Sequence, residues 1–217
     1  EDNFFYDGLL GLNIPDINTL VNMGIYNCSV LNYPNLKVGT FGLNIQQQKV
    51  IKEALENNYE YVLILEDDIY FNTRYFKVLD LIFDRYKNID ILYFGFLDYK
   101  KDSSLLFDNI DEIYGYSILK PKNDLLQKIK IGGFFSVLMS RKALEIYISR
   151  FDPIDNVSDI LLCDIAFDIK HDFSNKKKIK TTNNLNVLFI NHLFKMDVCD
   201  GDGFYNYRLL IKCVSRH

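Results

Sequence analysis

The sequence lacks several features that would assign it to a common class of protein. It has no tryptophan, three histidines and four cysteines, and no two cysteines form the CxxC pair of a zinc knuckle or thioredoxin-like motif. No Ser-His-Asp order, nucleophile elbow, P-loop or GxGxxG segment appears, so hydrolase, kinase and dehydrogenase chemistry has no motif here. The longest apolar runs are strand-length, far short of the roughly 20 residues that span a bilayer, and we expect no transmembrane segment. Free thiols are expected at Cys28, Cys163, Cys199 and Cys213, with a Cys199–Cys213 pair as the alternative in an oxidising compartment.

The charge balance excludes a further class. Lys and Arg total 25 and Asp and Glu total 29, a net charge of −4, so we expect no nucleic-acid partner. The local basic run Lys176-Lys177-Lys178 with Lys180 is expected to be a solvated loop, with an anion contact as the alternative. Apolar residues at 48% exclude a disordered chain, and 217 residues favour one domain, residues 1–217. The compartment stays open: we expect a soluble protein, cytoplasmic or associated with a host or virion, from a virus or a low-GC bacterium.

The spacing of apolar residues and the positions of glycine, proline and capping residues predict alternating helices and buried strands. This is the pattern of an α/β sheet with helices on its faces. The first forty residues are broken by glycine and proline and are expected to form loops with short strands or helical turns. Asn44, Thr73 and Ser140 are the expected N-caps of the first three helices. The helices are expected at residues 44–58, 73–86, 141–150 and 157–169. The strands are expected at residues 59–65, 89–94, 134–139 and 185–190, with a hairpin around residues 114–119 and the last strand at 185–190.

Three carboxylates follow one predicted buried strand directly. Glu66, Asp67 and Asp68 come after the apolar run of residues 59–65, and a strand buried on both faces cannot hold them inside the sheet. They must emerge at its carboxyl end, the edge at which open α/β sheets bind ligands. Glu66 and Asp68 point to the same side on extended backbone and can grip one Mg²⁺ or Mn²⁺ through oxygen. The alternative is that the three acids cap the next helix or face water.

A second acidic segment lies between the last two predicted helices. If a divalent cation bridges the diphosphate of a nucleotide sugar, transfer with inversion needs one more carboxylate to take the proton of the incoming hydroxyl. Asp155 and Asp159 are the candidates, and they face one side together if the helix starts early. The alternative for each is N-capping of the helix and compensation of its macrodipole.

The run YEYVLILEDDIYF at residues 59–71 resembles the LEDD segment of glycosyltransferase family 25, which includes bacterial lipooligosaccharide and collagen hydroxylysine galactosyltransferases. Other segments agree in order, from residue 4 to residue 159. They are FFYDG at 4–8, Gly42, DILYFG at 90–95, the glycine–strand–SRKA stretch at 132–143 and PID at 153–155.

The resemblance implies a GT-A fold, a UDP-sugar donor, and metal and diphosphate contacts at Glu66, Asp67 and Asp68. It implies a proton-accepting or sugar-binding acid at Asp155. Substrate contacts are expected at Tyr6, Asp7, Gly95, Gly132, Gly133 and Gln47. Many GT-A enzymes add a late histidine to the metal shell, and His192, after the strand at 185–190, is the candidate; the alternative is a histidine donating to a nearby carbonyl.

Two departures accompany the resemblance. Where the family has Ser-His before LEDD, this chain has Gln46-Gln47, so amides replace that pair or its role is lost. The family's opening arginine-bearing strand has no counterpart before Glu1. The sequence thus predicts an inverting, Mn²⁺- or Mg²⁺-dependent hexosyltransferase acting on a glycan or protein acceptor, with a homodimer as a further candidate assembly. The alternatives are a degenerate glycan- or protein-binding module and a metal-dependent phosphotransfer domain.

Overall fold

The computed structural model describes residues 2–7, 15–32, 38–66, 69–70, 75–98, 106–122, 131–132, 136–172, 177–190, 195–196 and 208–214. The helices are α1 (Ile17–Asn22), α2 (Val38–Glu56), α3 (Tyr75–Arg85), α4 (Arg141–Phe151) and α5 (Ser158–Ala166), with a 3₁₀ turn η2 (Cys28–Asn32). The strands are β1 (Asp2–Asp7), β2 (Tyr61–Glu66), β3 (Ile69–Tyr70), β4 (Ile91–Tyr93), β5 (Leu97–Asp98), β6 (Phe107–Ile113), β7 (Tyr116–Pro121), β8 (Ile131–Gly132), β9 (Ser136–Ser140), β10 (Ile169–Asp172), β11 (Lys177–Lys180), β12 (Val187–Ile190), β13 (Lys195–Met196) and β14 (Arg208–Val214).

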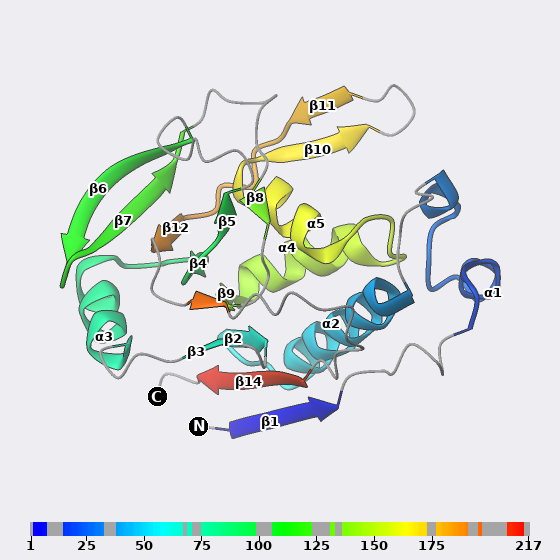
Figure 1. Ribbon diagram of the computed structural model, residues 1–217, viewed down its shortest axis with the longest axis horizontal. Helices are drawn as coiled ribbons and strands as arrows, with labels where there is room; N and C mark the ends of the chain where they lie inside the picture. Colours follow the sequence, from blue (N-terminus) through cyan, green and yellow to red (C-terminus); the bar gives the residue numbers. More distant parts are fainter. Residues whose placement is uncertain are drawn as a thin grey trace.

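Eight of these strands form one open sheet in the order β1-β14-β2-β9-β4-β12-β7-β6. The β4–β12 pair is parallel and the other neighbouring pairs are antiparallel, so the sheet is mixed. In Figure 1, α2, α4 and α5 are grouped together, and α3 stands apart from them near the β6–β7 hairpin. The predicted α/β class with a mixed sheet and flanking helices is confirmed.

Each central strand contributes to two hydrophobic cores, one on each face of the sheet. On β4, Ile91 and Tyr93 belong to the core that includes residues of α2, α4 and α5, while Leu92 and Phe94 belong to the core beside α3. Successive side chains of a strand point to opposite faces, so burial on both faces requires an uninterrupted apolar run. Fully burying one such side chain contributes about 1.5–3 kcal/mol. The continuous apolar runs of the sequence therefore identified these strands.

The start of α2 and the end of α5 differ from the prediction. Helix α2 begins at Val38, so the expected N-cap Asn44 lies inside the helix and is fully buried. Gly39 had suggested that the loop region continues to residue 40, but Gly39 and Gly42 both lie within the helix, and tertiary packing overrides the low helix propensity of glycine. Helix α5 ends at Ala166 rather than at residue 169.

Other boundaries agree better. Helix α3 spans Tyr75–Arg85, within the predicted 73–86, although Thr73 lies outside the described residues. Ser140 caps α4 as predicted: its Oγ accepts from the Ala143 amide at 3.2 Å. The hairpin expected around residues 114–119 is the β6–β7 pair.

Two features of the second half of the chain are corrections. The basic run was expected to be a loop, but Lys177–Lys180 forms β11, which pairs with β10. The strand at 187–190 is not the last one, because β14 follows it and lies between β1 and β2. The apolar stretch Leu209-Leu210-Ile211 was the signal in the sequence that should have indicated β14. Among the described residues, Cys28 and Cys163 are not in a disulfide; Cys199 lies outside them.

No helix in the described ranges is both long enough and apolar enough to cross a membrane.

Candidate functional site

Five strands of the large sheet run in one direction, and four of them, β1, β2, β4 and β12, lead to predicted site residues. The fifth is β6, because β6 and β12 are both antiparallel to β7. β2 and β4 are both antiparallel to β9, and β4 is parallel to β12, so β2, β4 and β12 run the same way. β1 is antiparallel to β14, which is antiparallel to β2, so β1 shares this direction; Figure 1 shows the arrows of β1 and β2 pointing alike and that of β14 reversed. We call the edge at which these four strands end, at Asp7, Glu66, Tyr93 and Ile190, the carboxyl edge.

The carboxyl edge brings together predicted site residues that are far apart in the sequence. Asp7, the last residue of β1, pairs with Arg208, and Glu66, the last residue of β2, pairs with Leu209, the next residue of the same strand. Because one strand separates β1 from β2, the backbones at Asp7 and Glu66 lie about 10 Å apart. Tyr6 precedes Asp7 in β1. The predicted residues Asp67, Asp68, Gly133 and His192 lie outside the described residues.

The two predicted glycines within the described residues are also brought close together. Gly95 is buried and lies two residues beyond the end of β4 at the carboxyl edge. Gly132 belongs to β8 and pairs with Leu97 of β5, two residues further along the chain than Gly95. The Phe94 amide donates to the Ser136 carbonyl at 3.2 Å, which ties the end of β4 to the start of β9.

The structure separates the two acidic candidates that were expected to share a helix face. Helix α5 begins at Ser158 with Val157 as its N-cap, so Asp155 precedes the helix. Among the described residues the cap makes no side-chain hydrogen bond, and the capping alternative for Asp155 is wrong. Asp159 lies in the first turn, where its Oδ1 accepts from the Ile160 amide at 2.8 Å, so it does compensate the helix terminus.

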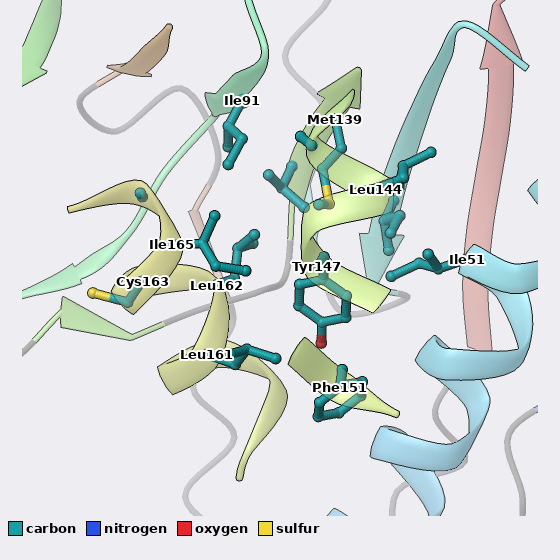
Figure 2. Packing of buried hydrophobic residues seen from close by; sticks show 14 of the residues in the cluster. Ile51, Ile91, Met139, Leu144, Tyr147, Phe151, Leu161, Leu162, Cys163 and Ile165 are labelled. Carbon is teal, nitrogen blue, oxygen red and sulfur yellow. The ribbon is translucent and has the colours of Figure 1, made fainter. Parts of the chain in front are cut away.

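Asp159 lies near two buried tyrosines of the core that includes residues of α4 and α5. Burial raises the pKa of the Tyr93 hydroxyl well above its usual value, and the charges of Cys163 and Asp159 add to this effect. The pKa of Tyr147 is raised in the same way, first by burial and then by Asp159. Figure 2 shows the Tyr147 ring packed near Phe151, with its hydroxyl turned away from Met139.

The cation Arg150 lies among the acids of this region. Arg150, at the end of α4, donates from Nη2 to the Ile169 carbonyl at 2.6 Å. Burial lowers the pKa of the Arg150 guanidinium, and the charges of Asp164, Asp155 and Asp168 oppose that effect. Arg150 therefore supplies positive charge beside Asp155 from the side of α4.

Gln47 is a polar residue without any hydrogen-bond partner among the described residues. Its side chain is 0% exposed, and both Nε2 and Oε1 lack a partner there. Ser158 is 1% exposed, and its Oγ is in the same situation. A buried donor or acceptor left unpaired costs about 1–3 kcal/mol. Sequence reasoning named Gln47 only through the resemblance. In the structure Gln47 stands out because its amide is buried and has no hydrogen-bond partner among the described residues.

Two further residues of α2 were missed by the sequence reasoning. Asn44 and Gln48 are buried and hydrogen-bonded to the segment of residues 151–158, which carries Asp155. The available signal was the run of amides Gln46-Gln47-Gln48 close to Asn44 in one helix, because amides that become buried need specific partners.

The predicted metal ligands remain a prediction. Where side chains are described, no three His, Cys, Asp or Glu residues are grouped as a metal site would require. The chemistry of the predicted donor set suits Mg²⁺ or Mn²⁺, since β2 ends at Glu66 and two more carboxylates follow it in the sequence.

No protein-family model and no curated protein matches this chain. The resemblance to glycosyltransferase family 25 therefore rests on the sequence segments alone.

Proposed function

We propose that this chain is a metal-dependent, inverting glycosyltransferase of the GT-A type, which transfers a hexose from a UDP-sugar to a hydroxyl of a glycan or hydroxylated side chain. The observation that carries the proposal is the convergence of separate sequence segments on the carboxyl edge. Asp7 and Glu66 end β1 and β2 there, and Gly95 follows β4 at the same edge. The resemblance to family 25 had selected these residues from distant segments, and binding at the carboxyl edge is the general behaviour of open α/β sheets.

The acids of the chain have distinct proposed roles. Glu66, Asp67 and Asp68, with His192, would hold Mn²⁺ or Mg²⁺, which supplies charge neutralisation for the departing diphosphate. Asp155 accepts the proton of the acceptor hydroxyl as its oxygen bonds to the anomeric carbon and the bond from that carbon to the UDP oxygen breaks. The products are the glycoside and UDP. Asp159, with the buried phenols of Tyr93 and Tyr147 nearby, helps to orient the acceptor.

Release of UDP tests this proposal directly. The purified chain is incubated with Mn²⁺ and a panel of UDP-hexoses, and both UDP release and the shift in melting temperature are measured. We expect one donor to give release that chelation of the metal abolishes. The variant Asp68→Asn should lose turnover and keep the wild-type melting temperature, because an acid at a strand end contributes little to packing. Asp80→Asn on the exposed side of α3 is the matched control and should keep both. Turnover that is unchanged in Asp68→Asn would refute the proposed metal site.

A second candidate is a non-catalytic sugar-binding module of the same fold. Gln47 favours it, because an uncharged amide stands where the resemblance has histidine. Thermal stabilisation by a UDP-sugar without any UDP release would support this candidate. Phosphatase turnover that is indifferent to UDP would instead support the phosphotransfer alternative.

A further inference from the structure

The segment of residues 151–158 is held from two sides by contacts between residues that are distant in the sequence. On one side, the Asn27 amide donates to the Ile154 carbonyl at 2.8 Å, and the Ile154 amide donates to the Ile25 carbonyl at 2.9 Å. Both backbone groups of the residue immediately before Asp155 are therefore paired. Residues 25–27 thus fix the backbone on the N-terminal side of Asp155.

Helix α2 holds the C-terminal side. Asn44 Nδ2 donates to the Asn156 carbonyl at 3.2 Å, across 112 residues of chain. Asn44 Oδ1 accepts from the Ser158 amide at 3.2 Å, across 114 residues. The Asn44 carboxamide thus bonds through its donor and its acceptor to Asn156 and Ser158, which both follow Asp155. The bond to Ser158 also satisfies a backbone amide at the start of α5, where the N-cap residue makes no side-chain hydrogen bond.

Gln48 and Lys52, one and two turns further along α2, hold the beginning of the segment. Gln48 Nε2 donates to the Phe151 carbonyl at 2.9 Å and to Asp152 Oδ1 at 3.2 Å. Lys52 Nζ lies 2.7 Å from Asp152 Oδ2, but that pair is nearly half exposed and contributes little. On the side of α2, the buried contacts of Asn44 and Gln48 are therefore the ones that fix the segment.

We propose that Asn44 is a positioning residue for Asp155: its carboxamide holds the backbone after Asp155 so that the carboxylate meets the acceptor in one fixed orientation. This inference rests on the proposed function. Asn44 is 0% exposed and lies in the second turn of α2, so it does not touch the acceptor itself. Its side chain also hydrogen-bonds Tyr26, but its bonds to the 156–158 backbone are the ones that bear on Asp155. A misplacement of about 1 Å at a catalytic group can lower a rate by up to about 100-fold.

The choice of Asn at this position follows from the two bonds. Aspartate would keep the acceptor for the Ser158 amide and lose the donor to the Asn156 carbonyl. Leucine, of similar size, would lose both. The test therefore uses Asn44→Asp and Asn44→Leu, with Asn57→Leu as the matched control, because Asn57 lies just after α2, is exposed, and donates to the Glu53 carbonyl of its own helix.

Two measurements separate positioning from general stability. By hydrogen exchange, we expect the Ser158 amide to exchange at least about tenfold faster in Asn44→Leu, with a smaller change in Asn44→Asp and none in Asn57→Leu. By turnover, we expect kcat to fall by about 10- to 100-fold in Asn44→Leu while KM for the donor stays within about twofold, since the donor is bound at the carboxyl edge. If Asn44→Leu does not fold, Asn44→Asp carries the test.

The outcomes discriminate between the two proposals. Unchanged exchange at Ser158 in both Asn44 variants, or wild-type kcat in them, overturns the positioning role. Equal acceleration of exchange throughout α5 also overturns it, because that result shows a purely structural role. If the wild-type chain itself releases no UDP with any donor, the proposed function fails and the catalytic part of this inference fails with it, while the exchange result still decides whether Asn44 holds the segment.

Discussion

Replacement of Gln47 by methionine should stabilise the protein, which is the reverse of the usual effect of a mutation in a buried position. Both polar atoms of the Gln47 side chain are buried and have no partner among the described residues. Each unpaired buried group costs about 1–3 kcal/mol, and methionine has a similar shape with no donor to satisfy. The two groups together cost at least about 2 kcal/mol, and imperfect packing takes back up to about 1.5 kcal/mol, so we expect a net gain of at least about 0.5 kcal/mol. For a chain of this size that corresponds to a rise in melting temperature of at least about 1–2 °C.

The neighbouring Gln48 is the control for this prediction. It is a glutamine in the same helix, 8% exposed, but its Nε2 donates to the Phe151 carbonyl at 2.9 Å. Gln48→Met leaves that carbonyl without its donor and should destabilise the fold by about 1–3 kcal/mol. Urea or thermal unfolding of the two variants should therefore give shifts of opposite sign.

A Gln47→Met variant that is destabilised as much as Gln48→Met would refute the reasoning, because the amide would then have partners within the fold. If Gln47 contacts the substrate as proposed, the stabilised variant should also show a smaller thermal shift with UDP-sugars. A residue that lowers stability and raises binding is expected at a functional site.

Two further predictions concern charged groups that are not among the predicted site residues. The Asp90 carboxylate accepts from Ser140 Oγ at 2.9 Å and from the Asn186 amide at 2.8 Å, and so joins the ends of β4, β9 and β12. Asp90→Ala should therefore lower the free energy of unfolding by about 2–3 kcal/mol, measured by urea titration. A change below about 0.5 kcal/mol would contradict this prediction. The pKa of Asp111 is lowered chiefly by its hydrogen bond with Arg85 and then by the Glu112 amide and Tyr86, so its stabilisation is present above the unfolded pKa of about 3.9 and is lost as the pH falls through the lower folded pKa. Asp111→Asn should therefore reduce the fall in melting temperature between about pH 5 and pH 2, and an unchanged fall would show that Asp111 does not contribute to it.

The sequence indicated the central sheet because the physics of its strands is local. Strands β4, β9 and β12 are buried on both faces, and a strand of that kind must be apolar at every position. Strand β14 was missed although it too has an apolar run. Its place in the sheet depends on pairing with residues 2–7, some two hundred residues earlier. No local sequence pattern predicts a pairing partner at that distance.

The error at α5 has a related cause. An acid before a predicted helix suggests an N-cap, and Asp155 was therefore considered as one. The amide of Ser158 is instead satisfied by Asn44, 114 residues away, so no side chain near Val157 is needed. Because the partner comes from another helix, Asp155 does not supply the cap of α5.

Three of the four buried amides on α2 are best explained together. Asn44 and Gln48 offset the cost of burial through hydrogen bonds to residues 151–158, whereas Gln47, between them in the sequence, makes none among the described residues. A helix that only needed to fill the core beside Tyr147 would be more stable with an apolar side chain at position 47. Two of the amides fix the segment that bears Asp155, and the third keeps an unused donor and acceptor in the same helix. That combination is expected if α2 serves a binding site as well as the core, and the opposite shifts of Gln47→Met and Gln48→Met are the test that separates these two demands.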